Sequence, residues 1–312
     1  SRRVKARFDK CHNNKKMKTL PTEQEIYSTF SDFFYFSFDL LGKIEPNNLN
    51  LKFAVVNMQI ALELFLKYYF ISQDKQDKII KGKNDNIDFV DFSQILNFYF
   101  SQPNYSFGNK KELAKILEAR NYIVHRGLKS GWNEEIALYL INCVYFIEGI
   151  IRYDFNSSLF DMLDYKRILS VANNTIWKKG VENFITTYSK NHKIDFLYCN
   201  DCNTNSFVTN NFFSFYGEDD EDSLQCLCCF TYIPSQAGKL LKCFFCNKKS
   251  FLTDILNPQD NQLYYGKCLS CDTKSFVRKC KNCDCYYHPN EKKEIIKNGK
   301  YFCSDICGSC EE

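Results

Sequence analysis

Apolar positions recur with a helical period from residue 21 to about residue 155. Side chains three and four positions apart share one face of a helix, so this pattern predicts amphipathic helices. The second of them is apolar on most faces and should lie at the centre of the core. Five helices joined by short turns make a helical bundle. They are predicted over about 22–43, 49–73, 90–101, 109–126 and 133–154.

Two further helices are predicted between residues 156 and 195, around the stretches LFDMLDYKRIL and TIWKKGVENFITTYSK. From residue 196 onwards, aromatic and β-branched residues mix with turn residues and the helical period fades, which predicts short strands and tight turns. The other end of the chain is basic, because residues 1–18 carry eight Lys/Arg and one Asp. Such a block is typical of a solvated tail, although an arm that grips nucleic acid is an alternative.

The composition is that of a globular protein, with 45% apolar and 25% charged residues in a chain of 312. Glu63 and Lys67 interrupt the longest apolar stretch, so no membrane helix is expected. The basic start lacks the apolar centre of a secretory signal. We therefore expect a soluble, cytoplasmic protein without a membrane partner. The net charge of +4 is too small to identify another partner.

Cysteine is the strongest compositional signal, because fifteen of the 17 cysteines fall in the last 114 residues. Twelve of these form six close pairs, and pairing neighbours leaves intervening segments of 23, 21 and 19 residues. This layout predicts three zinc sites with four cysteine ligands each. The predicted ligands are Cys199, Cys202, Cys226 and Cys229, then Cys243, Cys246, Cys268 and Cys271, and finally Cys280, Cys283, Cys303 and Cys307.

Disulfides are the competing interpretation of these pairs, but the missing secretory signal and the uniform close spacing argue against them. Four thiolates leave no open position on the metal, which favours structural Zn²⁺ over a catalytic ion. The first two sites resemble zinc ribbons and the third a treble clef. The surplus residues that compete for ligand positions are Cys228, Cys285, His288 and Cys310.

The predicted fold is an all-α helical bundle followed by a small, Cys-rich, zinc-stabilised region that is mostly β or irregular. The predicted divisions are a basic arm (1–20), the bundle (21–155), a helical connector (156–195) and the zinc-binding region (196–312). Within the last, residues 230–302 hold 13 Lys/Arg against 6 Asp/Glu. The aromatic residues among these cations either stack nucleic-acid bases or form the small cores that such modules need. They are Phe244, Phe245, Tyr264, Tyr265, Phe276, Tyr286 and Tyr287.

Arg120 interrupts the apolar side of the fourth predicted helix, and Asn121 and His125 share the adjacent flank. The apolar residues around it are Leu113, Ile116, Leu117, Ile123 and Val124. A guanidinium in an apolar interface needs a partner. One interpretation is a structural role, either a buried ion pair with Glu63 of the second helix or a hydrogen bond to a carbonyl. The other is a groove or subunit interface that presents the three polar residues to a ligand. Arginine suits a phosphate and histidine suits proton transfer near neutral pH, so the trio points to phosphodiesters.

The sequence RNYIVH at 120–125 resembles the Arg-x4-His motif of the HEPN superfamily (higher eukaryotes and prokaryotes nucleotide-binding domain). The second predicted helix, AVVNMQIALELFLKYYF at 54–70, is similar to the core helix of that superfamily. The resemblance implies an all-α, usually dimeric, metal-independent endoribonuclease. Arg120 would hold the scissile phosphate, Asn121 would support the site and His125 would act as general acid and base. Attack by the ribose 2′-hydroxyl would leave a 2′,3′-cyclic phosphate and restrict the substrate to RNA.

The resemblance also implies that two copies of the motif face each other across a homodimer, and that the protein serves as a toxin or anti-phage effector. One residue departs from the toxin branch, because Gly127 stands where that branch usually has Tyr, so control through that tyrosine is doubtful. A rival hypothesis is a non-catalytic scaffold whose zinc modules bind nucleic acid or a regulatory protein. A third is a zinc-ribbon regulator of the transcription type.

Overall fold

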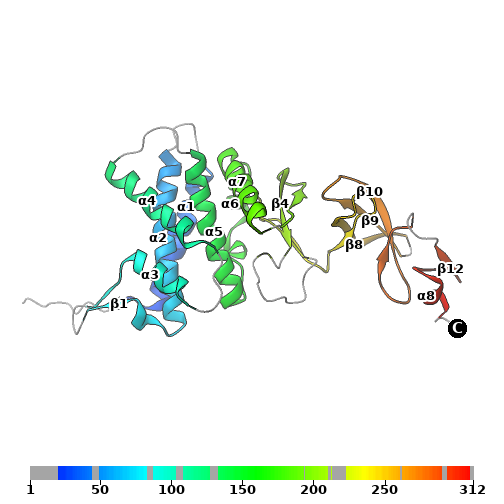
Figure 1. Ribbon diagram of the computed structural model, residues 1–312, viewed down its shortest axis with the longest axis horizontal. Coiled ribbons are helices and arrows are strands. Elements are labelled where there is room, and N and C mark those ends of the chain that lie inside the picture. Colours follow the sequence, from blue (N-terminus) through cyan, green and yellow to red (C-terminus); the bar gives the residue numbers. More distant parts are fainter. Residues whose placement is uncertain are drawn as a thin grey trace, which may run out of the picture.

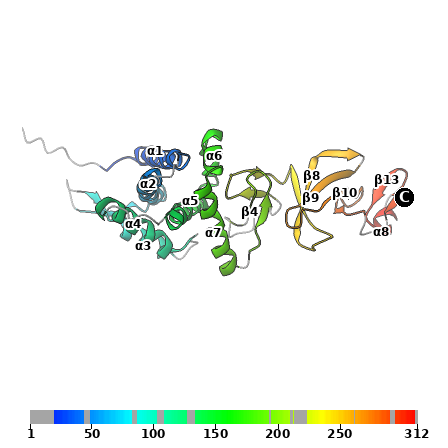
Figure 2. The same cartoon turned by 90° about the horizontal axis from the view of Figure 1, so that it is seen from above.

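The chain has a helical part at one end and a β-rich, Cys-containing part at the other (Figures 1 and 2). This division agrees with the predicted order, in which an α-helical region is followed by a Cys-rich β region. Gly127, Cys310 and the basic arm with Cys11 and His12 lie outside the described residues. The computed structural model describes residues 20–43, 49–82, 87–102, 108–126, 133–192, 194–209, 212, 223–260, 262–289 and 294–309.

The five predicted helices are present, with bounds within two residues of those expected from the apolar period. They are α1 (Glu23–Leu41), α2 (Leu49–Ser72), α3 (Phe92–Phe100), α4 (Lys110–Arg126) and α5 (Asn133–Phe155). Thr22 caps α1 and forms a capping box with Glu25, as that pair of residue types favours. The central position predicted for α2 is confirmed, since α2 packs against each of the other four helices.

Helices α2 and α5 are long and apolar enough to cross a membrane by length and composition alone. However, 56% and 72% of their apolar windows are buried inside the protein. Their apolar character therefore has an explanation as the hydrophobic centre of the bundle.

The segment after α5 adds two helices, α6 (Tyr165–Ala172) and α7 (Thr175–His192), which pack against α1 and α5. Short 3-10 turns lie at Gln76–Lys78 and Phe160–Met162. The polar connection expected between α2 and α3 contains a small antiparallel ladder that the sequence pattern did not predict. It pairs β1 (Ile80–Lys81) with β2 (Asp88–Phe89).

The Cys-rich region consists of antiparallel sheets in three modules. The first sheet has the order β3-β4-β5-β6, and the second β11-β10-β9-β8-β7. The third module is a hairpin followed by a short helix. The strands of the first sheet are β3 (Leu197–Cys199), β4 (Thr204–Thr209), β5 (Leu224–Cys226) and β6 (Tyr232–Ile233). Those of the second are β7 (Gly238–Lys242), β8 (Lys249–Asp260), β9 (Leu263–Cys268), β10 (Lys274–Lys279) and β11 (Tyr286–Tyr287). The third module holds β12 (Ile295–Lys297), β13 (Lys300–Phe302) and α8 (Asp305–Ser309).

The first module shares one hydrophobic core with the helices. Its turn after β5, residues 226–230, enters the helical part. The Tyr145 hydroxyl donates a hydrogen bond to the Leu227 carbonyl at 2.5 Å, and Trp177 Nε1 donates to the Cys228 carbonyl at 2.9 Å. Both donors are fully buried, so these bonds satisfy polar groups that water does not reach.

A buried ion pair makes a second connection between the helices and the first sheet. Glu148 of α5 is fully buried and accepts hydrogen bonds from Arg152, the Ser158 hydroxyl and the Leu159 amide. The Arg152 guanidinium also donates to Gln225 of β5 at 3.3 Å. Hydrogen bonds from these donors offset the free energy that the Glu148 carboxylate loses when it leaves water.

Phe230, at the end of the 226–230 turn, has a left-handed backbone with φ of +60°. A bulky side chain rarely adopts this conformation, which costs roughly 1–3 kcal/mol. Its ring stacks on Phe160 at 4.4 Å between centroids and also contacts Trp177 and Phe38. Burial of the ring among the helices therefore offsets the backbone strain.

We predict that Phe230→Asn destabilises the helical part by roughly 3 kcal/mol or more, although asparagine suits a left-handed backbone better, because the buried ring is lost. Denaturant unfolding followed by the helical circular dichroism signal measures this. The matched control is Asn247→Phe, which places the same ring at an exposed left-handed position after a cysteine pair of the second module. It should cost no more than the roughly 1–2 kcal/mol of backbone strain. A larger loss in the control than in Phe230→Asn would contradict the assignment.

Candidate functional site

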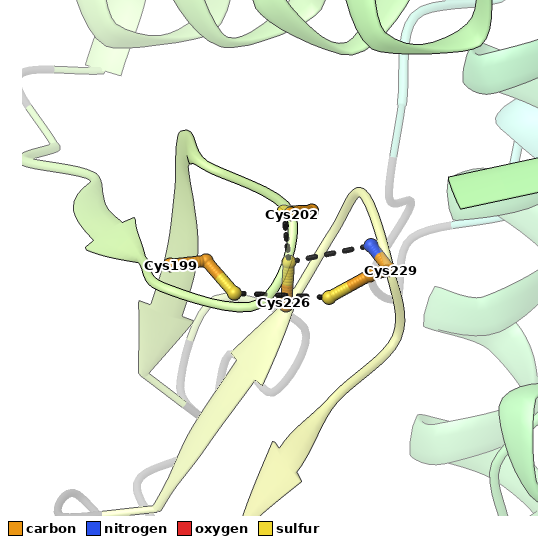
Figure 3. A group of neighbouring side chains, drawn as sticks. All are labelled: Cys199, Cys202, Cys226 and Cys229. Carbon is orange, nitrogen blue, oxygen red and sulfur yellow. Dashed lines mark hydrogen bonds between the residues drawn. The ribbon is translucent and has the colours of Figure 1, made fainter. Parts of the chain in front are cut away.

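The twelve predicted cysteine ligands come together in three groups of four. Within each group all sulfur atoms lie within 4.8 Å of one another. In every group two cysteines come from one turn and two from another, as the spacing of the pairs predicts. The groups are Cys199, Cys202, Cys226 and Cys229, then Cys243, Cys246, Cys268 and Cys271, and last Cys280, Cys283, Cys303 and Cys307. Figure 3 shows the first group.

The distances between sulfur atoms distinguish a metal site from disulfides. In the first group, Sγ of Cys199 lies 3.7 Å from that of Cys229, and Sγ of Cys202 lies 3.6 Å from that of Cys226. The corresponding distances in the second group are both 3.7 Å. A tetrahedral ion with metal–sulfur bonds of about 2.3 Å separates its sulfur ligands by about 3.8 Å. A disulfide needs about 2.05 Å. The four-thiol geometry therefore fits a metal ion such as Zn²⁺.

The turns that carry the cysteines stabilise thiolate sulfur. In the first group the amides of Cys228 and Cys229 donate to Sγ of Cys226 at 3.3 Å. In the second the amides of Ser270 and Cys271 donate to Sγ of Cys268 at 3.4 Å. Amide donors favour the charged form of sulfur, which is the form that binds metal.

The residue after the second cysteine of a pair has a left-handed backbone in five turns. Asparagine and aspartate tolerate this conformation well, and four of the five positions carry them. These four are Asn203, Asn247, Asp272 and Asp284, with φ between 55° and 62°. The fifth is Phe230, the turn that enters the helices. An Asn or Asp after a close cysteine pair is thus a signal for such a turn in addition to the cysteine spacing.

Two outer cysteines have lowered pKa values. The Thr273 hydroxyl lowers the pKa of Cys271 to about 6, and the Cys285 thiol lowers that of Cys283 to about 6. These hydrogen bonds favour the thiolate form, which is the form that binds metal.

The surplus candidates have different positions. Cys228 is buried between the ligands Cys226 and Cys229 in the chain, and Sγ of Cys285 lies 3.0 Å from that of Cys283 in the third group. His288 does not join the third group, because its ring packs against Phe244 and Phe251 of the second module. Cys143 of α5 is buried in the helical core, and burial raises its pKa.

Arg120 lines an open cleft between α4, α2 and the β2–α3 connection, with a volume of about 390 Å³. Gln59, Glu63 and Lys67 of α2 line the same cleft. The Glu63 carboxylate accepts hydrogen bonds from Lys67 at 2.7 Å and from Gln59 at 3.2 Å. The anticipated ion pair between Arg120 and Glu63 is not formed within the described part of the chain.

Arg120 contacts a neutral partner instead of a carboxylate. One terminal nitrogen of its guanidinium donates to Oδ1 of Asn121 at 2.9 Å. Nε of Arg120 is buried and has no hydrogen-bond partner among the described residues. Asn121 and His125 are exposed one turn apart on α4, and Val124 between them is 51% exposed. Arg120 and Asn121 are therefore hydrogen-bonded to each other. His125 lies on the same helix but does not line the cleft.

Comparison with known protein families, characterised proteins and solved structures finds no match for the chain.

We predict that the protein carries three metal ions per chain and releases first the ions whose cysteine ligands are exposed. The four ligands of the first group are all buried, whereas the other two groups include exposed cysteines. A chromogenic chelator in excess should therefore remove two ions quickly and the third much more slowly. Elemental analysis gives the stoichiometry.

Cys283→Ser should lower the content to two ions, and its control, Cys285→Ser, should retain three because Cys285 belongs to no group of four. Equal release rates for all three ions, or loss of an ion from the control, would refute the assignment of ligands.

Proposed function

We propose that this chain is a HEPN-type, metal-independent endoribonuclease that acts as a homodimer in the cytoplasm, with three structural Zn²⁺ ions. The Arg-x4-His spacing on the fourth helix of the bundle suggests the superfamily. The substrate is RNA, because the reaction uses the ribose 2′-hydroxyl as nucleophile. A growth-arresting toxin or an anti-phage effector is the corresponding biological role.

One observation carries the proposal, namely that Arg120 lacks a carboxylate partner within the described residues. The other arginines with described side chains each form an ion pair. The pairs are Arg152 with Glu148, Arg167 with Asp39, and Arg278 with Glu294. Arg120 has a partly buried guanidinium beside an open cleft, and its planar fork suits a bidentate anion. In RNA that anion is the scissile phosphate.

His125 then supplies the proton chemistry. It takes a proton from the 2′-hydroxyl, the 2′ oxygen bonds to phosphorus, and the bond from phosphorus to the 5′ oxygen breaks. An imidazolium gives a proton to the departing oxygen, which leaves a 2′,3′-cyclic phosphate and a 5′-hydroxyl. Arg120 neutralises the charge that accumulates on the phosphate oxygens, and Asn121 fixes the guanidinium through their hydrogen bond.

The exposed face of α4 supports the dimer. Val124 is an apolar side chain on the surface between Asn121 and His125. A second copy of α4 packed on this face would bury Val124 and bring the two imidazoles together beside one RNA strand. The site in one chain would then be incomplete until the partner is present.

The three metal ions have a structural role in this proposal. Each is surrounded by four thiol ligands, which leaves no open position for a water molecule or a phosphate. The ions hold the turns and small sheets together, and the reaction depends on Arg120 and His125.

We predict that purified protein cuts total RNA in buffer without Mg²⁺ or Mn²⁺, and that His125→Ala lowers the rate by about 10² or more. Arg120→Ala should have a comparable effect, and Arg120→Lys an intermediate one because the charge remains without the planar fork. Products are resolved on sequencing gels and tested for cyclic phosphate. His192→Ala is the control, since this histidine is exposed on α7 away from the cleft and should leave the rate unchanged. Intact RNA with the wild-type protein, or full activity of His125→Ala, would favour the non-catalytic scaffold.

We further predict that Val124→Glu converts the dimer into folded monomers and abolishes cleavage, because two opposed carboxylates oppose burial of this face. Light scattering after size-exclusion chromatography measures the mass, and circular dichroism checks the fold. Leu169→Glu places the same charge at a 42% exposed position on α6 and should leave a dimer. A wild-type monomer that cuts RNA would disprove the interface.

A further inference from the structure

The second module has an open sheet face at β9 and β10. These strands pair antiparallel, with Lys267 opposite Lys274 and Tyr265 opposite Phe276. Side chains two positions apart on a strand share a face, so these four residues form one continuous group. The other face of the same strands holds the buried Cys268 and belongs to the small core of the module.

Tyr265 and Phe276 form an exposed aromatic pair on this face. Their rings lie 5.6 Å apart at 68°, and the side chains are 37% and 44% exposed. Tyr264, Tyr286 and Phe251 differ, because they pack into or against the module's core. The core therefore does not account for Tyr265 and Phe276, and their rings are presented to solvent.

A polar cleft of about 450 Å³ adjoins this group at the junction between the first and second modules. Lys267 lines the cleft together with Tyr198 and the side chains of Asn200, Asn203 and Asn205. The Asn200 oxygen accepts from Lys267 at 2.7 Å, and the Asn203 oxygen accepts from the Tyr198 hydroxyl at 3.1 Å. An amide NH₂ group can only donate, so Asn200 and Asn203 offer hydrogen-bond donors to a ligand in the cleft. A backbone bond from the Tyr198 amide to the Leu269 carbonyl holds the two modules together here.

The charge of the module favours an anionic ligand. Residues 239–281 hold nine Lys/Arg against three Asp, a formal +6. One ion held by four thiolates contributes −2, so a positive balance of about +4 remains by simple charge counting. Lys274 is exposed beside Phe276 on the open face, while Asp272 partly neutralises Lys267.

We propose that the Tyr265–Phe276 pair, Lys274 and the asparagine cleft form a binding site for single-stranded RNA. Exposed rings stack on unpaired bases, lysine contacts a phosphate, and amide groups hydrogen-bond base edges. A duplex keeps its bases stacked on one another and cannot use the rings. This site goes beyond the proposed cleavage and does not involve Arg120 or His125.

The test uses full-length, metal-loaded protein and a fluorescent single-stranded 2′-O-methyl RNA of about 20 nucleotides, longer than one such site needs. This probe lacks a free 2′-hydroxyl, so the proposed cleavage reaction cannot cut it. Fluorescence anisotropy gives the Kd. Tyr265→Ala and Phe276→Ala should each raise the Kd about tenfold. Lys274→Ala should reduce the slope of log K against log salt concentration by about 0.7, the value for one phosphate contact on a single strand.

Phe245→Ala is the matched control, since this ring is 65% exposed on the same module but lies outside the β9–β10 face. Its Kd should equal that of the wild type, and metal content should be unchanged in all variants. An unchanged Kd in Tyr265→Ala and Phe276→Ala, an equal loss in Phe245→Ala, or no binding by the wild type at about 100 µM protein would overturn the site. Because the probe is not a substrate, a failure here is separate from a failure of the His125 variants to lose cleavage.

Discussion

Tyr145 and Trp177 donate hydrogen bonds to two neighbouring carbonyls of the 226–230 turn, and through these bonds the helices hold the first metal-binding turn in place. The same turn places Phe230 among helical aromatic residues in spite of its left-handed backbone. The turn completes the core of the bundle, and a metal ion held by the first group would fix the turn. The free energy of binding such an ion would then contribute to the stability of the helices as well as to that of the sheet.

This coupling determines which surfaces remain available for ligands. The first module contacts α5 and α7, whereas α4 lies toward the opposite end of the molecule (Figures 1 and 2). The open face of β9 and β10 lies farther along the chain, beyond the first module. RNA held by the second module and RNA held by Arg120 would thus contact well-separated parts of the protein. A single strand that reaches both would gain effective concentration at the cleft without any change in the cleft itself.

Local patterns in the sequence predicted most of the helices and all three cysteine groups. A helical period and a close spacing of two cysteines are both short-range properties. The helices and the cysteine turns that they predict are present in the fold. The partners that arise from distant segments could not be predicted in this way. Glu148 lies within an apolar helix, and its burial depends on Ser158 and on Arg152, which in turn contacts Gln225 of a strand far along the chain. The missing ion pair between Arg120 and Glu63 likewise depends on other residues. Gln59 and Lys67 of α2 already donate hydrogen bonds to the Glu63 carboxylate.

The exposure of the cysteine ligands increases from the first group to the third. The buried group therefore contributes to the stability of the fold, whereas the exposed modules offer surface for ligands. The first group is wholly buried and belongs to the core of the helices. The second and third groups each support a core of only a few residues. Substitutions in the second and third modules therefore leave the packing around Tyr145 and Trp177 intact. The surface residues of β9 and β10 can thus be selected for ligand binding without loss of helix packing. The same change near the 226–230 turn would disturb helix packing, because that turn has no solvent-exposed side to absorb it. Ligand recognition is accordingly expected in the outer modules and on α4, and stability at the junction between them.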